Sequence, residues 1–274
     1  MLKKNRVVVA LLVWFSFIFL FMNFFQGFSI LNWLAKMQII PALLSVNLFV
    51  LIFWLMVTWL WGRIYCSLAC PLGISQDIFS HLRKGKKSFN YEPANNKLRY
   101  VILIAYIASL SLGIHAVFTL LSPYAIFARF AANVVNPLSV ILTRLLVGGG
   151  MVSNFAFMHL DKLTVEFFSY GLLSLSLSVI IMLVILVVAH LKGRWYCNNI
   201  CPVGTLLGLI SFRSRQRIFI EVDKCVKCGN CERKCKASCI DSSNYTVDNS
   251  RCIVCFNCLD GCPKEAIHFG KLKK

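Results

Sequence analysis

The sequence predicts an all-α membrane bundle of four transmembrane helices in two parallel repeats, followed by a small α+β domain of the two-cluster ferredoxin type. Three observations lead to this prediction. The chain contains long apolar runs without charge, a cysteine motif occurs twice, and eight regularly spaced cysteines lie near the C-terminus. We expect a membrane domain over residues 1–217 and a ferredoxin-like domain over residues 218–274.

The composition favours a membrane protein over a soluble one. Of the 274 residues, 58% are hydrophobic and only 15% are charged, whereas soluble domains carry about 25% charged residues. So much apolar surface cannot be buried in one core, and we expect lipid to cover part of it. The net charge of +18 fits the basic cytoplasmic flanks of membrane proteins. Nucleic acid is not an expected partner, because no soluble segment interleaves basic and aromatic residues.

Four apolar runs are long enough to cross a bilayer, since each exceeds roughly 18 residues. The predicted helices cover residues 7–25, 37–61, 100–121 and 167–191. The first run could be a signal peptide, but no convincing small-residue cleavage site follows it, and we expect it to remain.

A fifth apolar stretch, residues 131–160, is ambiguous. Arg144 lies in its middle and three glycines interrupt it, and an arginine at the bilayer centre costs about 2.5–3.5 kcal/mol. We expect residues 122–166 to form an outer loop with short helices that lies on the membrane. A re-entrant hairpin is the alternative.

The basic residues predict the orientation. They gather before the first helix, after the second and after the fourth: Lys3, Lys4, Arg6; Arg83, Lys84, Lys86, Lys87; Lys192, Arg194, Arg213, Arg215, Arg217. Between the first two helices there is only Lys36. These positions predict a multi-pass protein of the bacterial cytoplasmic membrane, with both termini and the ferredoxin-like domain in the cytoplasm.

An internal repeat supports four spans. The segment from Gly62 to Gly73 matches the segment from Gly193 to Gly204 at an offset of 131 residues, and both contain Gly-Arg-x-Tyr-Cys-x₃-Cys-Pro-x-Gly. Each copy follows an apolar helix, so two helices and one motif form a unit that occurs twice. Asp77 follows only the first motif, which argues against a shared role for it.

The C-terminal cysteines carry the most specific signal. Each of two segments, 27 residues apart, has the spacing C-x₂-C-x₂-C-x₃-C of two-cluster ferredoxins, in which the fourth cysteine ligates the other cluster. The predicted ligands are, for cluster 1, Cys225, Cys228, Cys231 and Cys262, and for cluster 2, Cys252, Cys255, Cys258 and Cys235. Zinc is the alternative, but a zinc site usually needs two cysteine pairs.

The flanks of these cysteines agree with a ferredoxin domain. Residues 217–222 and 267–269 are predicted as short strands. Lys236 replaces the proline that usually follows the fourth cysteine, and its charge is one influence on the cluster potential. Cys239 is an additional thiol, interpreted as a small buried residue, with a ligand role as the alternative.

Cys66, Cys70, Cys197 and Cys201 of the repeated motifs allow two interpretations. In the first, they hold a further metal or cluster or form redox thiols, because sulfurs at i and i+4 share a helix face. In the second, the motif is a membrane-exit turn with tyrosine and arginine at headgroup level. Recurrence of both cysteines favours the first.

The histidines and outer acidic residues give weaker signals. His115 and His190 lie at different predicted depths, which argues against a bis-histidine haem. His159, Asp161 and Glu166 could accept protons from a quinol, but the preferred interpretation is that they are ordinary loop residues.

The paired motifs together with the two-cluster tail resemble the NapH-type quinol dehydrogenase membrane subunit, and the NosR and CcoG-type proteins share this plan. The resemblance covers roughly residues 5–270. It implies four spans, oxidation of quinol, and electron delivery to a periplasmic or membrane-associated iron–sulfur or cytochrome partner. The four motif cysteines and the eight tail cysteines match the family's positions. The missing proline after Cys235 is the visible departure.

Two other functions remain as alternatives. CcoG-like relatives imply a metal-reducing factor for the maturation of a respiratory metalloenzyme, with the motif cysteines as working thiols. A redox-sensing membrane regulator is the third hypothesis, although no output domain is visible in the sequence.

Overall fold

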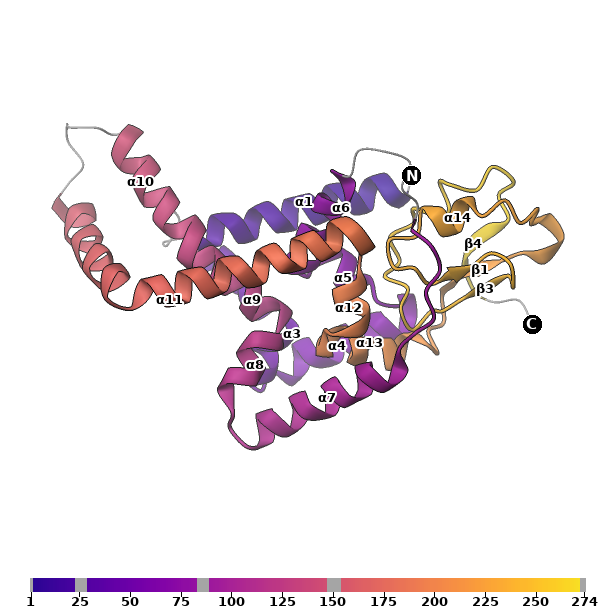
Figure 1. The fold of residues 1–274 in the computed structure, drawn as a ribbon, viewed down its shortest axis with the longest axis horizontal. Helices are drawn as coiled ribbons and strands as arrows, with labels where there is room; N and C mark the ends of the chain where they lie inside the picture. The colour runs from indigo at the N-terminus through magenta and orange to yellow at the C-terminus, as the bar shows by residue number, and fades with distance from the viewer. Residues whose placement is uncertain (1, 23–28, 83–88, 147–153, 272–274) are drawn as a thin grey trace.

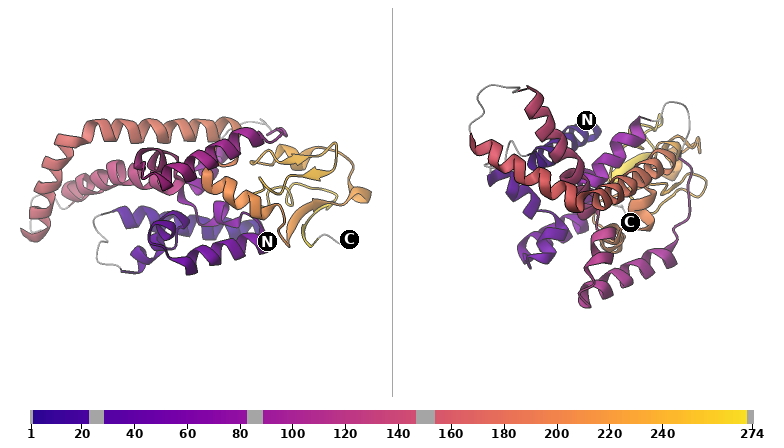
Figure 2. Two further views of the ribbon diagram at one scale, coloured as in Figure 1. Left: turned by 90° about the horizontal axis from the view of Figure 1, so that it is seen from below. Right: turned by 60° about the vertical axis from the view of Figure 1, so that its left-hand side comes forward.

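The computed structural model describes residues 2–22, 29–82, 89–146 and 154–271. It shows an elongated helical part that is capped at one end by a small part rich in cysteine (Figure 1). The beginning of the first helix and the last strand both lie at this capped end (Figures 1 and 2). The order of elements therefore places the first and last described segments on the same side of the molecule.

The helical part contains the two predicted repeats. The first comprises α1 (Leu2–Phe21), α2 (Ser29–Lys36), α3 (Ile39–Leu44), α4 (Leu48–Trp61), α5 (Ile64–Leu68) and α6 (Pro71–His81). The second comprises α7 (Asn96–Ser111), α8 (His115–Leu121), α9 (Pro123–Phe130), a π-helix (Ala131–Val135), α10 (Asn136–Leu146), α11 (Asn154–Lys192), α12 (Trp195–Asn199) and α13 (Pro202–Ser211).

Two helical segments of the described chain are long and apolar enough to cross a membrane, Leu2–Phe21 and Leu173–Lys192. The other two predicted spans are each divided, so the expectation of four continuous spans is not confirmed. Asn47 begins a new helix, α4, by accepting a hydrogen bond from the backbone of Val50. Gly113, at a φ of 70°, adopts the left-handed conformation that ends α7.

Large apolar side chains face outward along these helices. Leu12 of α1 is 62% exposed, Phe49 of α4 is 79% exposed and Ile104 of α7 is 67% exposed. Exposed apolar surface on this scale is unusual for a soluble monomer and is typical of a surface that lipid or another protein covers.

The predicted outer loop is more helical than expected. α9, the π-helix and α10 account for its first part, as predicted, but α11 already begins at Asn154 and continues through the predicted fourth span. Residues 147–153 and the side chains of Arg144, His159, Asp161 and Glu166 lie outside the described part of the structure.

The two repeats are interlocked. In the first repeat α1 packs on α5 and α6, and in the second α7 packs on α12 and α13. The helix before each motif also packs on the helix after the other motif, α4 on α13 and α11 on α6. This packing of each repeat on the other brings both cysteine motifs to the middle of the molecule.

The cysteine-rich part contains four short strands. β1 (Arg217–Ile220) pairs antiparallel with β4 (Ile267–Gly270), and β2 (Ile240–Asp241) pairs with β3 (Thr246–Val247). A 3₁₀ turn (Val222–Lys224) and α14 (Asn230–Arg233) lie between β1 and β2. The predicted strands near residues 217–222 and 267–269 are confirmed. Their pairing brings the two ends of this part together.

The connection between the repeats runs across the cysteine-rich part (Figure 1). The backbone amide of Tyr91 donates to Glu232 Oε1 at 3.0 Å, and that of Glu92 donates to the carbonyl of Ser238 at 3.3 Å. The chain therefore contacts the C-terminal part before α7 begins.

Asp77 joins three segments at the boundary between the two parts. Its carboxylate pairs with Arg6 of α1 at 3.0 Å, with Arg194 of the second motif at 2.9 Å, and with Lys236 of the cysteine-rich part at 3.5 Å. Burial by itself would raise the pKa of Asp77, but Arg194, Lys236 and Arg6 together hold this pKa well below its usual value. The sequence did not predict these ion pairs, because the partners of Asp77 come from distant segments.

We expect Asp77→Asn to lower the free energy of unfolding by about 3–5 kcal/mol, because it leaves buried arginines without a countercharge. Equilibrium unfolding in mixed detergent micelles measures the change. Glu92→Gln is the control, since it removes only an exposed pair with Lys192, worth about 0–1 kcal/mol. Equal effects of the two substitutions would contradict the role given to Asp77.

Candidate metal centres

The four cysteines of the repeated motifs meet inside the helical part. Cys66 and Cys197 lie on the single-turn helices α5 and α12, and Cys70 and Cys201 directly precede α6 and α13. All four side chains are 4–6% exposed. A proline opens each following helix, where its fixed φ suits the first turn and its missing N–H is not needed. The motif thus turns the chain sharply and buries both thiols.

Each motif's arginine binds the other motif. Arg63 donates to the carbonyl of Cys197 at 3.0 Å, and Arg194 donates to the carbonyl of Cys66 at 3.0 Å. Each guanidinium also approaches the first sulfur of its own motif, at 3.9 Å for Cys66 and 3.8 Å for Cys197. The two copies are therefore related by an approximate two-fold arrangement, with two positive charges beside the thiols.

The last glycine of each motif permits this close approach. A Cβ at Gly73 would overlap the carbonyl oxygen of Cys66 and lie 2.6 Å from Arg194 Nη1. A Cβ at Gly204 would likewise overlap the carbonyl of Cys197 and lie 2.6 Å from the guanidinium of Arg63. Since backbone atoms cannot move aside as a flexible side chain can, both positions require glycine.

The arginines are buried, at 0% exposure for Arg63 and 1% for Arg194. The tyrosines of the motif are buried too: Tyr65 donates to Gln38 Oε1 at 2.7 Å, and Tyr196 donates to the carbonyl of Leu121 at 3.1 Å. The interpretation of the motif as a membrane-exit turn at headgroup level is therefore wrong, because these side chains bind the protein interior.

The four thiols lie close enough to affect one another's ionisation. Burial, together with Cys197 and Cys66, raises the pKa of Cys70 to about 12. Burial, Cys197 and Cys66 raise the pKa of Cys201 in the same way. Buried thiolates need a compensating positive charge, which two arginines supply in part and a bound cationic centre would complete.

This donor set fits a cluster better than a single ion. Within the described chain, no three His, Cys, Asp or Glu side chains converge closely enough to hold one metal ion. A [4Fe–4S] cubane carries its irons at four corners and spreads four thiolate ligands more widely than one ion does. The four motif sulfurs are buried, and guanidinium groups lie beside two of them, those of Cys66 and Cys197.

The four cysteines predicted for cluster 1 line one small cavity. Cys225, Cys228, Cys231 and Cys262 surround it together with Gly229. Cys228 is exposed, and Cys225 and Cys262 are half-buried. This site therefore lies at the outer surface of the cysteine-rich part.

The four cysteines predicted for cluster 2 are buried on the side that faces the helices. Cys235, Cys252, Cys255 and Cys258 are 4–8% exposed. Burial and the nearby Cys235 together raise the pKa of Cys255 to about 11. Cys239 is 1% exposed, with its sulfur 3.5 Å from that of Cys235.

Lys236, the residue in the place of the expected proline, attaches this site to the second motif. Its carbonyl accepts a hydrogen bond from the backbone of Arg194 at 2.7 Å, and its ammonium group reaches Asp77. Asn198 adds a bond from its amide to the carbonyl of Ala237 at 2.9 Å. A proline could not make the ion pair with Asp77, which gives a physical reason for the lysine.

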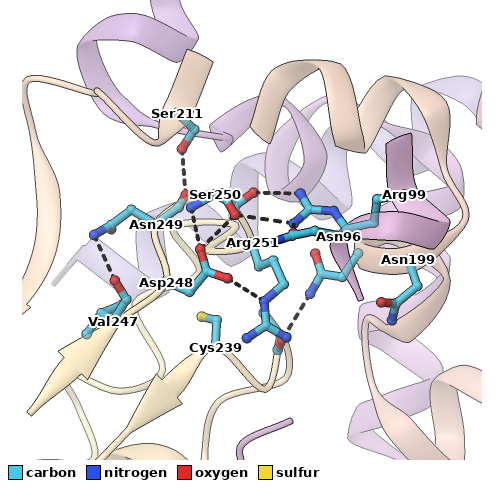
Figure 3. Close-up of polar contacts among 12 residues, drawn as sticks. Asn96, Arg99, Asn199, Ser211, Cys239, Val247, Asp248, Asn249, Ser250 and Arg251 are labelled. Carbon is cyan, nitrogen blue, oxygen red and sulfur yellow. Dashed lines mark hydrogen bonds and ion pairs between the residues drawn. The ribbon is translucent and has the colours of Figure 1, made fainter. Parts of the chain in front are cut away.

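A loop from Asp248 to Arg251 attaches the same site to the rest of the helical part (Figure 3). The carbonyl of Ser250 accepts from Arg63 at 3.0 Å and from Arg99 at 3.5 Å. Ser211 of α13 donates to the carbonyl of Asn249 at 2.8 Å (Figure 3). Cys252 follows this loop directly, so both motif arginines lie beside the segments that carry the cluster 2 cysteines.

Several site residues were missed by the sequence analysis. Arg6 was interpreted only as a flanking charge of the first apolar helix and Arg99 was not considered, yet they are 8% and 1% exposed. Gln76 accepts a hydrogen bond from the thiol of Cys197 at 3.4 Å. Both arginines share one feature in the sequence that could have indicated a buried role, a basic residue in the first turns of an otherwise apolar helix. Of the two histidines, His190 lies 3.5 Å from the carbonyl of Phe79, and the side chain of His115 lies outside the described residues.

Comparison with known families supports iron–sulfur chemistry. A family model described as a 4Fe-4S binding domain matches residues 44–90 and 176–219, which contain the two motifs. The two cysteine motifs, their crossing and the ferredoxin-like tail define an iron–sulfur electron-transfer protein of the ferredoxin type.

Named relatives extend this similarity over most of the chain. The putative electron transport protein YccM of Escherichia coli is 22% identical over 82% of this chain and 55% of its own length. The methylamine utilization ferredoxin-type protein MauN of Paracoccus denitrificans is 26% identical over 71% of this chain and 54% of its own. The ferredoxin-type protein NapH of E. coli is 25% identical over 74% of this chain and 60% of its own.

The chain is similar to the NapH-like ferredoxin-type electron transport proteins over most of its length. It spans little more than half the length of the three relatives named here. No solved structure matches it.

We expect Gly73→Ala to destabilise the protein by about 1–3 kcal/mol, as overpacking does, and to reduce the iron bound per chain. Thermal unfolding in detergent and iron analysis measure both effects. Gly270→Ala is the matched control, because nothing lies within 4 Å of its added Cβ. Normal iron content in the Gly73 variant would show that the motifs need not cross closely.

Proposed function

We propose that this protein is a membrane-bound electron-transfer protein that oxidises quinol and passes the electrons through [4Fe–4S] clusters to a partner reductase system. The observation that carries the proposal is the order of three thiol sites. The motif cysteines are buried where the two motifs contact each other. The cluster 2 cysteines lie in segments that are hydrogen-bonded to these motifs, and the cluster 1 cysteines reach the surface at Cys228. Such a series provides a route between the helices and the outer face of the ferredoxin-like part.

Three cofactors belong to this proposal. Cluster 1 is held by Cys225, Cys228, Cys231 and Cys262, and cluster 2 by Cys252, Cys255, Cys258 and Cys235, as the spacing predicts. A third cluster is held by Cys66, Cys70, Cys197 and Cys201. Burial of these four thiols beside two arginines, and the family match over both motifs, support it.

The proposal places the helices in a membrane. α1 and the second half of α11 each form one span, and α3 with α4, and α7 with α8, form the other two. The outward apolar side chains of α1, α4 and α7 support this arrangement. Both termini and the ferredoxin-like part then lie in the cytoplasm, in agreement with the basic flanks. The partner is an iron–sulfur or cytochrome subunit, periplasmic or membrane-associated.

We expect about twelve iron and twelve sulfide per chain, because three cubanes contribute four of each. Anaerobic purification in detergent, iron and sulfide analysis, and low-temperature EPR of the dithionite-reduced protein measure this. About eight would leave the motif cysteines as thiols and favour the alternative metal-reducing function. Four or fewer, or zinc in place of iron, would overturn the proposal.

Serine substitutions assign the third cluster. Cys66→Ser combined with Cys197→Ser should reduce the iron to about eight per chain while the EPR signals of the tail clusters persist. Cys239→Ser is the control and should retain about twelve, since Cys239 is not among the proposed ligands. Loss of four iron in the control instead would assign Cys239 as a ligand.

Quinol oxidation is tested separately. Protein with intact clusters is mixed anaerobically with menadiol or decylubiquinol, and bleaching of the cluster absorption is followed. Reduction by at least one of them is the expected result. If neither reduces clusters that dithionite does reduce, the protein is not a quinol dehydrogenase.

A further inference from the structure

A cavity of about 350 Å³ lies between α1, α6 and the ferredoxin-like part. Its volume is within the range of about 300–1,000 Å³ that is usual for small-molecule sites. Its lining combines apolar side chains, among them Leu11, Ile78 and Leu82, with polar ones, among them Arg6, His81 and Asn257. The cavity therefore suits a ligand with a polar head and an apolar body.

Polar residues of the cavity lining adjoin the cluster 2 site. Asn257 lies in the chain between the proposed ligands Cys255 and Cys258. Lys236, which also lines the cavity, directly follows the proposed ligand Cys235. A molecule in the cavity thus lies next to both segments that carry the cluster 2 ligands, the one with Cys235 and the one from Cys252 to Cys258.

Hydrogen-bond donors are found among the residues that line the cavity. The guanidinium of Arg6 donates through Nη1 to Asp77 and to the carbonyl of Ser67, and Asn257 contributes an amide side chain. Because guanidinium and amide N–H groups donate, these residues favour a ligand that presents an oxygen acceptor.

The charges of the cavity exclude a cation as the preferred ligand. Asp77, whose carboxylate lies at the cavity, is already paired with Arg6, Arg194 and Lys236. Lys3 also lines the cavity. The remaining charge is positive, which suits a neutral head group with hydroxyl or carbonyl oxygens.

We propose that this cavity binds the head group of an isoprenoid quinol, with its ring oxygens toward Arg6 and Asn257 and its tail leaving between α1 and α6. The inference rests on the proposed function and adds the place where the substrate binds. The exposed apolar surface of α1 next to the cavity gives the tail a continuous path to lipid.

The reaction balances with the groups named. Oxidation of the quinol breaks two O–H bonds and leaves the quinone. The two electrons pass one at a time to oxidised clusters, which the partner reoxidises. The two protons leave through His81, which is exposed at the edge of the cavity, to water on the side of the ferredoxin-like part.

Two neighbouring leucines provide a matched test. Leu11 lines the cavity, whereas Leu12 is 62% exposed on the outer face of the same helix. Binding of the fluorescent quinol analogue 2-heptyl-4-hydroxyquinoline N-oxide and the rate of cluster reduction by decylubiquinol or menadiol are measured. Leu11→Trp should weaken binding and slow reduction at least tenfold, with full reduction by dithionite retained. Leu12→Trp should behave as the unmodified protein.

A second variant tests a polar residue of the lining. His81→Asn should slow reduction by quinol several-fold with little change in binding of the analogue, because the head group still fits but loses its proton acceptor. Unchanged reduction in this variant would overturn the role given to His81.

The outcomes distinguish a failure of the binding-site assignment from a failure of the proposed function. If quinol reduces the Leu11→Trp variant as fast as the unmodified protein, the cavity is not the site, and the proposed function stands. If quinol does not reduce the unmodified protein although dithionite does, the proposed function fails and the inference fails with it. Displacement of the analogue by phosphatidylglycerol but not by decylubiquinol would assign the cavity to a lipid and overturn the inference.

Discussion

The crossing of the two motifs is the constraint on which the rest of the structure depends. Arg63 and Arg194 each bind the backbone of the other motif, and a glycine in each motif leaves room for the guanidinium. Neither copy can adopt this conformation alone, because its arginine would then be buried without acceptors. The interlocked packing of α4 on α13 and of α11 on α6 follows from this exchange. Sequence duplication thereby produces one shared centre in place of two separate ones.

The same arginines attach the ferredoxin-like part to the helical part. Arg194 reaches Lys236 through its backbone and Asp77 through its side chain, while Arg63 reaches the carbonyl of Ser250. The two halves differ here, since Gly208 takes the position equivalent to Asp77 and meets the carbonyl of Ser250 closely. A buried ion network on one side and a close backbone contact on the other fix the tail in one orientation. Buried networks of this kind contribute to a unique geometry more than to stability.

This arrangement places the thiol sites in an order, from the interior of the helical part to the outer surface, that suits electron transfer. Buried thiols lie among the helices and at the adjoining cluster 2 site, and the exposed thiol of Cys228 lies at the far surface. Two buried arginines, Arg63 and Arg194, lie beside the inner thiols, where thiolate-bound clusters would need compensation. The iron–sulfur role of the NapH-like family is thus consistent with both the order of the sites and their surroundings.

The sequence by itself determined the repeat, the spacing of the eight tail cysteines and the pairing of the short strands near residues 217–222 and 267–269, because these depend on local spacing and on nearby turns. Helix boundaries were less certain: Asn47 and Gly113 divide apolar runs that composition alone joins. Only the tertiary structure decided the roles of Asp77, Arg6 and Arg99, whose distant partners lie 61 to 159 residues away. A charged residue gives no sign in sequence of whether it faces water or a buried countercharge, since that depends on which distant segment packs against it.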